Sequence, residues 1–169
     1  MALIEALLDE LNTEARVTRE FLDVLPDDKL DWRPHPKSMT LQELAGHVAE
    51  IPGWIAMTLG TDGLDFAAGD YTPPTARTRN EIIALLDRSV AEGRSALAGT
   101  TPDKLFNENW TMRTGDLIHS QHSRYASTWH CYAQLTHHRA QLGVYYRLLG
   151  VLVPQSYGPT ADYPEMVAV

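Results

Sequence analysis

The sequence contains a single cysteine, Cys131, among its 169 residues. One thiol excludes an internal disulfide framework and a cysteine-rich zinc site. Basic side chains are also few, because 14 Lys and Arg stand against 22 Asp and Glu and leave a formal net charge of -8. Since no run of Lys or Arg forms a basic patch, this charge repels phosphate backbones, and we expect no nucleic-acid partner.

Long apolar runs are missing as well. No stretch approaches the roughly 20 apolar residues that a membrane-spanning helix needs, so we expect no membrane partner. The N-terminal segment MALIEALLDELNTEAR carries acidic residues early and lacks the basic region of a signal peptide. The simplest compartment is therefore the cytoplasm. The sequence also lacks a P-loop, a dinucleotide-binding glycine pattern and a G-x-S-x-G nucleophile elbow.

What is present is a helical pattern in a chain that is 44% apolar and 21% charged, enough to bury the core of one domain over residues 1–169. Apolar residues recur at helical spacing in four segments. The predicted helices cover residues 2–25, 40–59, 78–98 and 121–149.

The ends of these helices and their connections are also marked in the sequence. Thr-x-x-Glu patterns begin the second and third helices, at Thr40 and Thr78, and Gly150 follows the fourth as its C-cap. We expect a long loop at residues 60–75 and a long crossover at residues 99–119, with room for a short extended piece. The last ~18 residues are expected to form an irregular surface tail. The fold class is therefore all-α, a four-helix bundle with long crossover connections.

The fourth helix carries an unusual polar stripe within the segment HCYAQLTHHRAQ, residues 130–141. At about 100° per residue, six polar-tipped side chains share one face of about 100°. They are His130, Gln134, His137, His138, Gln141 and Tyr145. A solvated helix face normally carries Lys, Glu and Arg, and Arg139 falls on the opposite side. We therefore predict that the stripe points into the bundle and that Arg139 points away from it.

Polar groups inside a bundle need partners, because burying one without a partner costs about 1–3 kcal/mol. His47 lies in the apolar face of the second helix and could face the stripe, or be a core histidine bonded to a carbonyl or a water. On the fourth helix no pair at i, i+4 is His–His, and an amide oxygen such as that of Gln134 is a poor ligand for zinc-like ions. A metal site and a satisfied polar network therefore both remain open. Cys131 is interpreted as a small buried thiol.

Two segments resemble the DinB-like superfamily, which includes DUF664-type proteins and thiol-dependent transferases and isomerases. SMTLQELAGHVAEIPGW, residues 38–54, is similar to that superfamily's second-helix segment with its histidine at His47. TWHCYAQLTHHRAQLGVYYRLLG, residues 128–150, is similar to the fourth-helix segment, whose usual form is His-x-x-His-His-Arg-Gly-Gln-Leu. The likeness covers most of the chain.

The resemblance implies a four-helix bundle with a divalent metal, commonly zinc or nickel, held by one histidine of the second helix and two of the fourth. Carried over by position, the ligands are His47, Gln134 and His138, with glutamine where the family generally has histidine. Ala140 stands where glycine is usual. His130 matches a position that is often histidine, and we interpret it as an outer partner of the ligands or a substitute ligand.

The resemblance also implies a chemistry. In related enzymes the metal binds the sulfur of a low-molecular-weight thiol, and the thiolate attacks an electrophile or assists an isomerisation. We therefore expect a metal-dependent thiol transferase or isomerase acting on a small-molecule substrate, and a possible homodimer. The alternative is a non-catalytic ligand-binding or structural bundle in which Gln134 marks a degenerate metal site.

Overall fold

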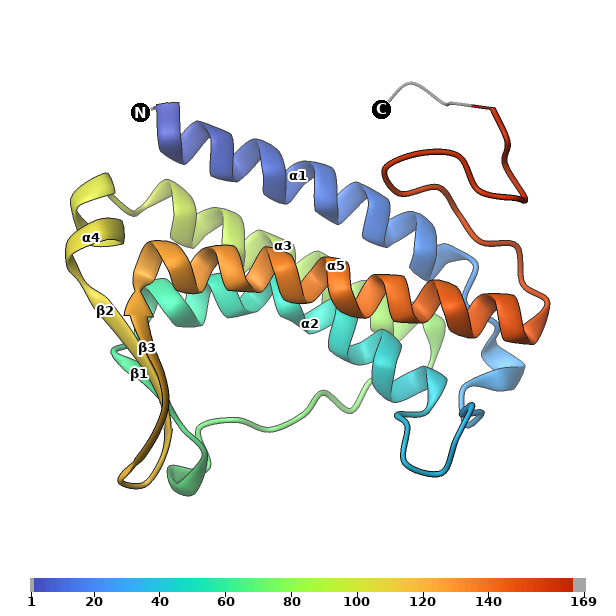
Figure 1. Cartoon of the computed structure of the whole chain (residues 1–169), viewed down its shortest axis with the longest axis horizontal. Coiled ribbons are helices and arrows are strands. Elements are labelled where there is room, and N and C mark those ends of the chain that lie inside the picture. The colour runs from blue at the N-terminus through green and yellow to red at the C-terminus, as the bar shows by residue number, and fades with distance from the viewer. Residues whose placement is uncertain (1, 166–169) are drawn as a thin grey trace.

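The computed structural model describes residues 2–165, so residue 1 and the end of the predicted tail and domain, residues 166–169, lie outside the described residues. Four long helices lie side by side, and a small sheet projects from one end of the bundle (Figure 1). The long helices are α1 (Ala2–Asp23), α2 (Leu41–Gly60), α3 (Arg79–Ala98) and α5 (Arg124–Leu149). The shorter elements are α4 (Pro102–Asn107) and the 3-10 turns η1 (Asp27–Lys29) and η2 (Phe66–Ala68). The predicted four-helix bundle is confirmed, with a small sheet added to it.

The helix ends follow from local hydrogen bonds. The Thr40 hydroxyl accepts from the Glu43 amide at 3.1 Å, and the Glu43 carboxylate accepts from the Thr40 amide at 2.7 Å, which completes a capping box before α2. Gly150 ends α5 at φ 73°, a left-handed conformation that glycine adopts without strain. In α5 the prediction began three residues too early, because residues 121–123 belong to a strand.

The backbones of α2 and α3 approach each other closely within the bundle. Gly93 of α3 faces Pro52 of α2, and a Cβ at Gly93 would lie 2.6 Å from the Pro52 carbonyl oxygen. Only a glycine allows the two backbones to approach so closely. Within residues 2–165, none of the helices combines the length and apolar character that crossing a bilayer requires.

The sheet has three strands in the order β1 (Gly63–Asp65), β2 (Asn109–Thr114) and β3 (Leu117–Ser123). β1 runs parallel to β2, and β2 and β3 form an antiparallel hairpin that turns at Gly115, where φ is 56°. The sequence predicted only a short extended piece here. Most residues of the hairpin are exposed, and the alternation of Trp110 and Met112 with polar residues in β2 is too short to predict a hairpin.

The hairpin is anchored to the bundle by Arg124, the first residue of α5. Its guanidinium donates to the carbonyls of Thr58 and Thr61 at the end of α2 and to the Glu108 carboxylate. The side chain of Arg124 is 5% exposed. This bonding joins the start of α5, the end of α2 and the hairpin into one corner of the molecule.

The prediction that Arg139 points away from the core is wrong. Arg139 is 1% exposed and pairs with Glu14 of α1, which is also 1% exposed. Its guanidinium also donates to the Thr18 hydroxyl at 3.1 Å and to the Tyr157 hydroxyl at 2.9 Å. An arginine can be buried when its charge and its donors are met in this way. The tail, expected only to cover the surface, thus completes a buried network through Tyr157.

Candidate functional site

The polar site forms where α2 and α5 pack together. The rings of His47 and His138 meet edge to face, with centroids 4.5 Å apart and an interplanar angle of 83°. The Gln134 amide oxygen lies 3.1 Å from Nε2 of His138, one turn away on α5. The three residues matched to the family's ligand positions therefore lie together, as neighbours across two helices.

A carboxylate that the sequence analysis missed orients His47. Nδ1 of His47 lies 2.7 Å from Oε1 of Glu50, and both side chains are largely buried, at 17% and 12% exposed. The Tyr71 hydroxyl donates to the same oxygen at 2.7 Å. A carboxylate accepts hydrogen bonds, so the neutral form of His47 has its hydrogen on Nδ1 and its lone pair on Nε2. The i, i+3 spacing of His47 and Glu50 in a predicted helix could have indicated this contact from the sequence.

His138 is held in its neutral form. Burial lowers the pKa of this imidazole, and the neighbouring His47 and His137 lower it further, while a hydrogen bond with Gln141 acts in the opposite direction. Nδ1 of His138 lies 3.3 Å from the Gln141 amide oxygen. A neutral imidazole is the form that binds a metal ion.

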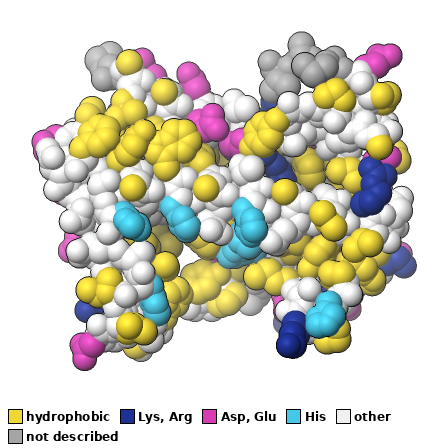
Figure 2. Space-filling view, in the orientation of Figure 1, with side chains coloured by type: hydrophobic (Ala, Val, Ile, Leu, Met, Phe, Trp, Pro, Cys, Tyr) yellow, Lys and Arg dark blue, Asp and Glu magenta, His cyan; other side chains and the backbone are white. Residues whose placement is uncertain are grey.

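The rest of the polar stripe does not point into the bundle as predicted. His130, His137 and Gln141 are exposed, and only Tyr145 is buried, where its hydroxyl donates to the Met39 carbonyl at 3.1 Å. Figure 2 shows histidine side chains gathered across the middle of one face, beside a hollow with hydrophobic side chains. The stripe therefore lies along the edge of the bundle, because α2 covers only part of it.

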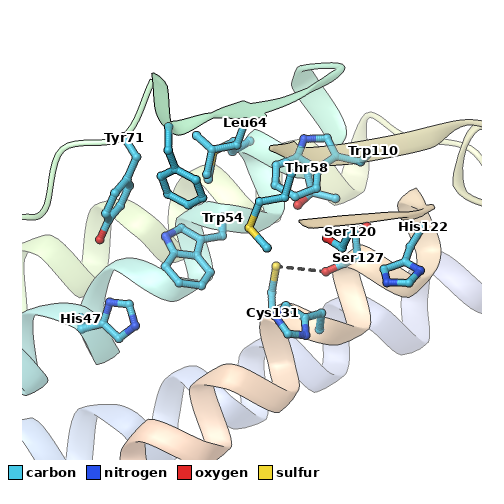
Figure 3. Close-up of a pocket in the computed structure, with 14 residues that line it drawn as sticks. His47, Trp54, Thr58, Leu64, Tyr71, Trp110, Ser120, His122, Ser127 and Cys131 are labelled. Atoms are coloured by element: carbon cyan, nitrogen blue, oxygen red, sulfur yellow. Dashed lines mark hydrogen bonds between the residues drawn. The ribbon is translucent and has the colours of Figure 1, made fainter. Parts of the chain in front are cut away.

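A cavity of about 350 Å³ extends from His47 between α2, α5 and the sheet (Figure 3). Its lining side chains come from four segments of the chain. They are His47, Trp54, Met57 and Thr58 from α2, Leu64, Phe66 and Tyr71 from the segment after it, Trp110, Met112, Ser120 and His122 from the hairpin, and Ser127, His130 and Cys131 from α5. This cavity could not be predicted from the sequence, because the hairpin and the β1 segment meet only in the folded chain.

Cys131 lies against this cavity but is not reactive there. It is 4% exposed, and its thiol donates to the Ser127 carbonyl at 3.3 Å, the contact marked in Figure 3. Burial raises the pKa of this thiol to about 12. The thiolate is the nucleophilic form, so Cys131 supplies neither a nucleophile nor a metal ligand near neutral pH. The interpretation of Cys131 as a buried thiol is confirmed.

The donor set for a metal ion consists of two imidazoles and one amide oxygen. Across residues 2–165, no group of three or more His, Cys, Asp or Glu side chains is placed to hold a metal. His47 and His138 are ligands that zinc and nickel accept, whereas the Gln134 oxygen is a weak ligand for these ions. By its chemistry the set thus offers two side chains that bind divalent transition metals well and one that binds them weakly.

The fold recurs in solved structures. A DinB-like protein of Bacillus subtilis superposes with a TM-score of 0.69 at 16% identity, covering 89% of this chain and 97% of that one. A DinB-like protein of Bacillus cereus gives 0.68 at 24% identity, covering 90% and 97%. A proposed DinB family member from Exiguobacterium sibiricum gives 0.68 at 21% identity, covering 92% and 97%.

No curated protein matches the chain significantly. The sequence model of one family, described as the DinB family, matches residues 2–166, which is almost the whole chain. This match agrees with the structural neighbours and with the likeness of the His47 and His138 segments. The chain belongs to the DinB family.

Proposed function

We propose that the chain binds a divalent transition-metal ion, zinc or nickel, through His47 and His138, with Gln134 as a weaker third ligand. The observation that carries the proposal is the contact of two partly buried imidazoles from separate helices, 4.5 Å between centroids. The hydrogen bond of His47 with Glu50 supports it, because a carboxylate behind a histidine fixes the tautomer and raises its basicity toward a metal. His130, at the cavity wall, stays a candidate outer partner or substitute ligand.

The proposed activity is a thiol-dependent transfer or isomerisation on a small molecule. When bound, such an ion lowers the pKa of a thiol that reaches it. The chain's own thiol cannot take this role, because Cys131 is buried and protonated. The thiol must therefore be an external low-molecular-weight one. The cavity beside His47 would hold the electrophilic substrate and keep water away from it.

A second candidate is a ligand-binding protein without a tight metal. The observation that favours it is the bonding of His138, whose two ring nitrogens face Gln134 at 3.1 Å and Gln141 at 3.3 Å. A neutral ring donates from one nitrogen only, so this network is complete without an ion when the Gln134 amide turns its NH2 group toward Nε2 while Nδ1 donates to Gln141. In this case Gln134 marks a site that has lost its metal.

Metal content distinguishes the two. Mass spectrometry on tag-free protein loaded with zinc or nickel should find about one ion per chain, lost in His47→Ala and in His138→Ala. His35→Ala, on an exposed loop, is the matched control and should keep the ion. Gln134→His should bind more tightly than the wild type, because imidazole replaces an amide oxygen. No ion in the wild type together with tight binding in Gln134→His would reject the metal proposal in favour of the second candidate.

The proposal extends to assembly and location. The α5 face exposes Trp129, Val144 and Leu148 at 44%, 59% and 60%, and such apolar faces are typical of bundles that pair as homodimers. Sedimentation equilibrium should then find a dimer, and a single 18.9 kDa species would contradict it. We keep the cytoplasm as the proposed compartment.

A further inference from the structure

The lining of the cavity indicates which small molecules it accepts. We propose that it binds a neutral, flat molecule of one or two aromatic rings, and excludes carboxylates, phosphates and ammonium ions. The inference rests on the proposed function only in taking this molecule as the substrate, since binding itself needs no metal.

Aromatic and sulfur-containing side chains form the walls. Trp54 of α2, Trp110 of β2 and Tyr71 are three of the aromatic residues (Figure 3). Phe66 of η2 is the fourth. Flat aromatic groups stack on such rings or meet them edge to face. Methionine adds a soft surface that fits irregular ligands, and Met112 lies in the wall on β2. The volume of about 350 Å³ is at the small end of ligand pockets.

Charged groups are absent from the lining. No Lys, Arg, Asp or Glu is among the described residues that line the cavity. An ionic ligand would lose its water shell there without gaining an opposite charge, which is strongly unfavourable. The excess of acidic residues in the chain acts further against anions.

The ionic side chains just behind the lining are already bonded. The Arg124 guanidinium donates to the carbonyl of the lining residue Thr58. It also donates to the Thr61 carbonyl and the Glu108 carboxylate. Glu50 accepts from both His47 and Tyr71 through one oxygen, Oε1. The Arg124 guanidinium is therefore committed to its own partners, and Glu50 is not among the described residues that line the cavity.

The polar groups that do reach the cavity are hydroxyls and imidazoles. Hydroxyls of Ser120 and Ser127 and the His122 ring lie at the end opposite His47 (Figure 3). They can bond one hydroxyl or carbonyl of a ligand whose rings lie between the tryptophans. The ligand would thus extend from the hairpin end toward His47, where the proposed chemistry takes place.

Isothermal titration calorimetry at pH 7 tests the proposal with three probes of one shape: 2-naphthol, 2-naphthoate and 2-naphthylmethylammonium. The neutral naphthol should bind, and both ions should bind more than about tenfold more weakly, because their charges are buried unpaired. The comparison is made in protein treated with EDTA, because a zinc ion bound at His47, a lining residue, would pair with the naphthoate carboxylate.

Two variants of lining residues and one control variant test whether the binding takes place in this cavity. Met112→Trp fills it and should weaken naphthol binding by more than about tenfold, whereas Ile118→Trp, exposed on β3, should leave binding unchanged. Ser120→Arg, opposite Met112 in the hairpin register, puts a cation beside the cavity and should shift the preference toward naphthoate.

Naphthoate binding as tight as naphthol in the wild type would overturn the inference. So would an absence of naphthol binding, or naphthol binding that Met112→Trp leaves intact. If the wild-type protein binds naphthol but no metal, the metal proposal is rejected and the ligand class stands. If it binds metal but no naphthol, the ligand class is rejected and the metal proposal stands.

Discussion

Removing the charge of Arg139 should be among the most destabilising single changes in the protein. The guanidinium lies between the rings of Phe21 and Tyr157, 5.9 and 5.5 Å from their centroids, and pairs with Glu14. The two charged side chains are 2% and 1% exposed, so almost no water reaches them.

Arg139→Met keeps much of the apolar volume but leaves the Glu14 carboxylate buried with one donor, the Tyr157 hydroxyl at 2.6 Å. Breaking a buried ion pair from one side costs about 3–5 kcal/mol. The matched control is Arg16→Met, whose pair with Glu20 is 47% and 46% exposed and should contribute at most about 1 kcal/mol.

Urea denaturation followed by far-UV circular dichroism at pH 7 measures both free energies of unfolding. The double variant Glu14→Leu with Arg139→Met should be less destabilised than the sum of the two single variants, because no charge is left unpaired. A cost for Arg139→Met no greater than that for Arg16→Met would refute the reasoning. Strict additivity of the two changes would refute it as well.

Three further outcomes follow from the structure. Gly93→Ala should cost about 1–3 kcal/mol in denaturation, because its Cβ would lie 2.6 Å from the Pro52 oxygen, whereas Gly60→Ala, with nothing within 4 Å, should not destabilise; equal effects would contradict this. The pKa of His138 is lower in the folded, metal-free protein than in the unfolded chain, so the unfolded chain binds a proton at His138 first as the pH falls below about 6.5. The free energy of unfolding, measured by urea denaturation, should therefore decrease below that pH, and it should decrease less in His138→Gln. Cys131, with its pKa raised to about 12, should react with a disulfide reagent at pH 8 only as fast as the protein opens, and rapid labelling of the folded protein would show the thiol is accessible.

Much of the fold could be predicted because it depends on short-range rules. Helical spacing, the capping box at Thr40 and the glycine at Gly150 act within a few residues of one another, so the long helices were found within a few residues of their ends. The pairing of His47 with the Gln134–His138 turn was also within reach, through a family likeness. The β2–β3 hairpin was not, because it is mostly exposed and held by long-range contacts.

The composition and the local patterns of the sequence by themselves determined the helices and the acidic charge, and the family likeness pointed to the residues proposed to ligate a metal. Which of those residues are buried was decided by the tertiary structure. Arg139 shows the reason. Helical periodicity gives the direction in which its side chain leaves the helix, but it does not show that Glu14, 125 residues earlier in the chain, neutralises its charge. Glu50 and the cavity wall show it too, because Tyr71 and the hairpin reach α2 only after the chain has folded.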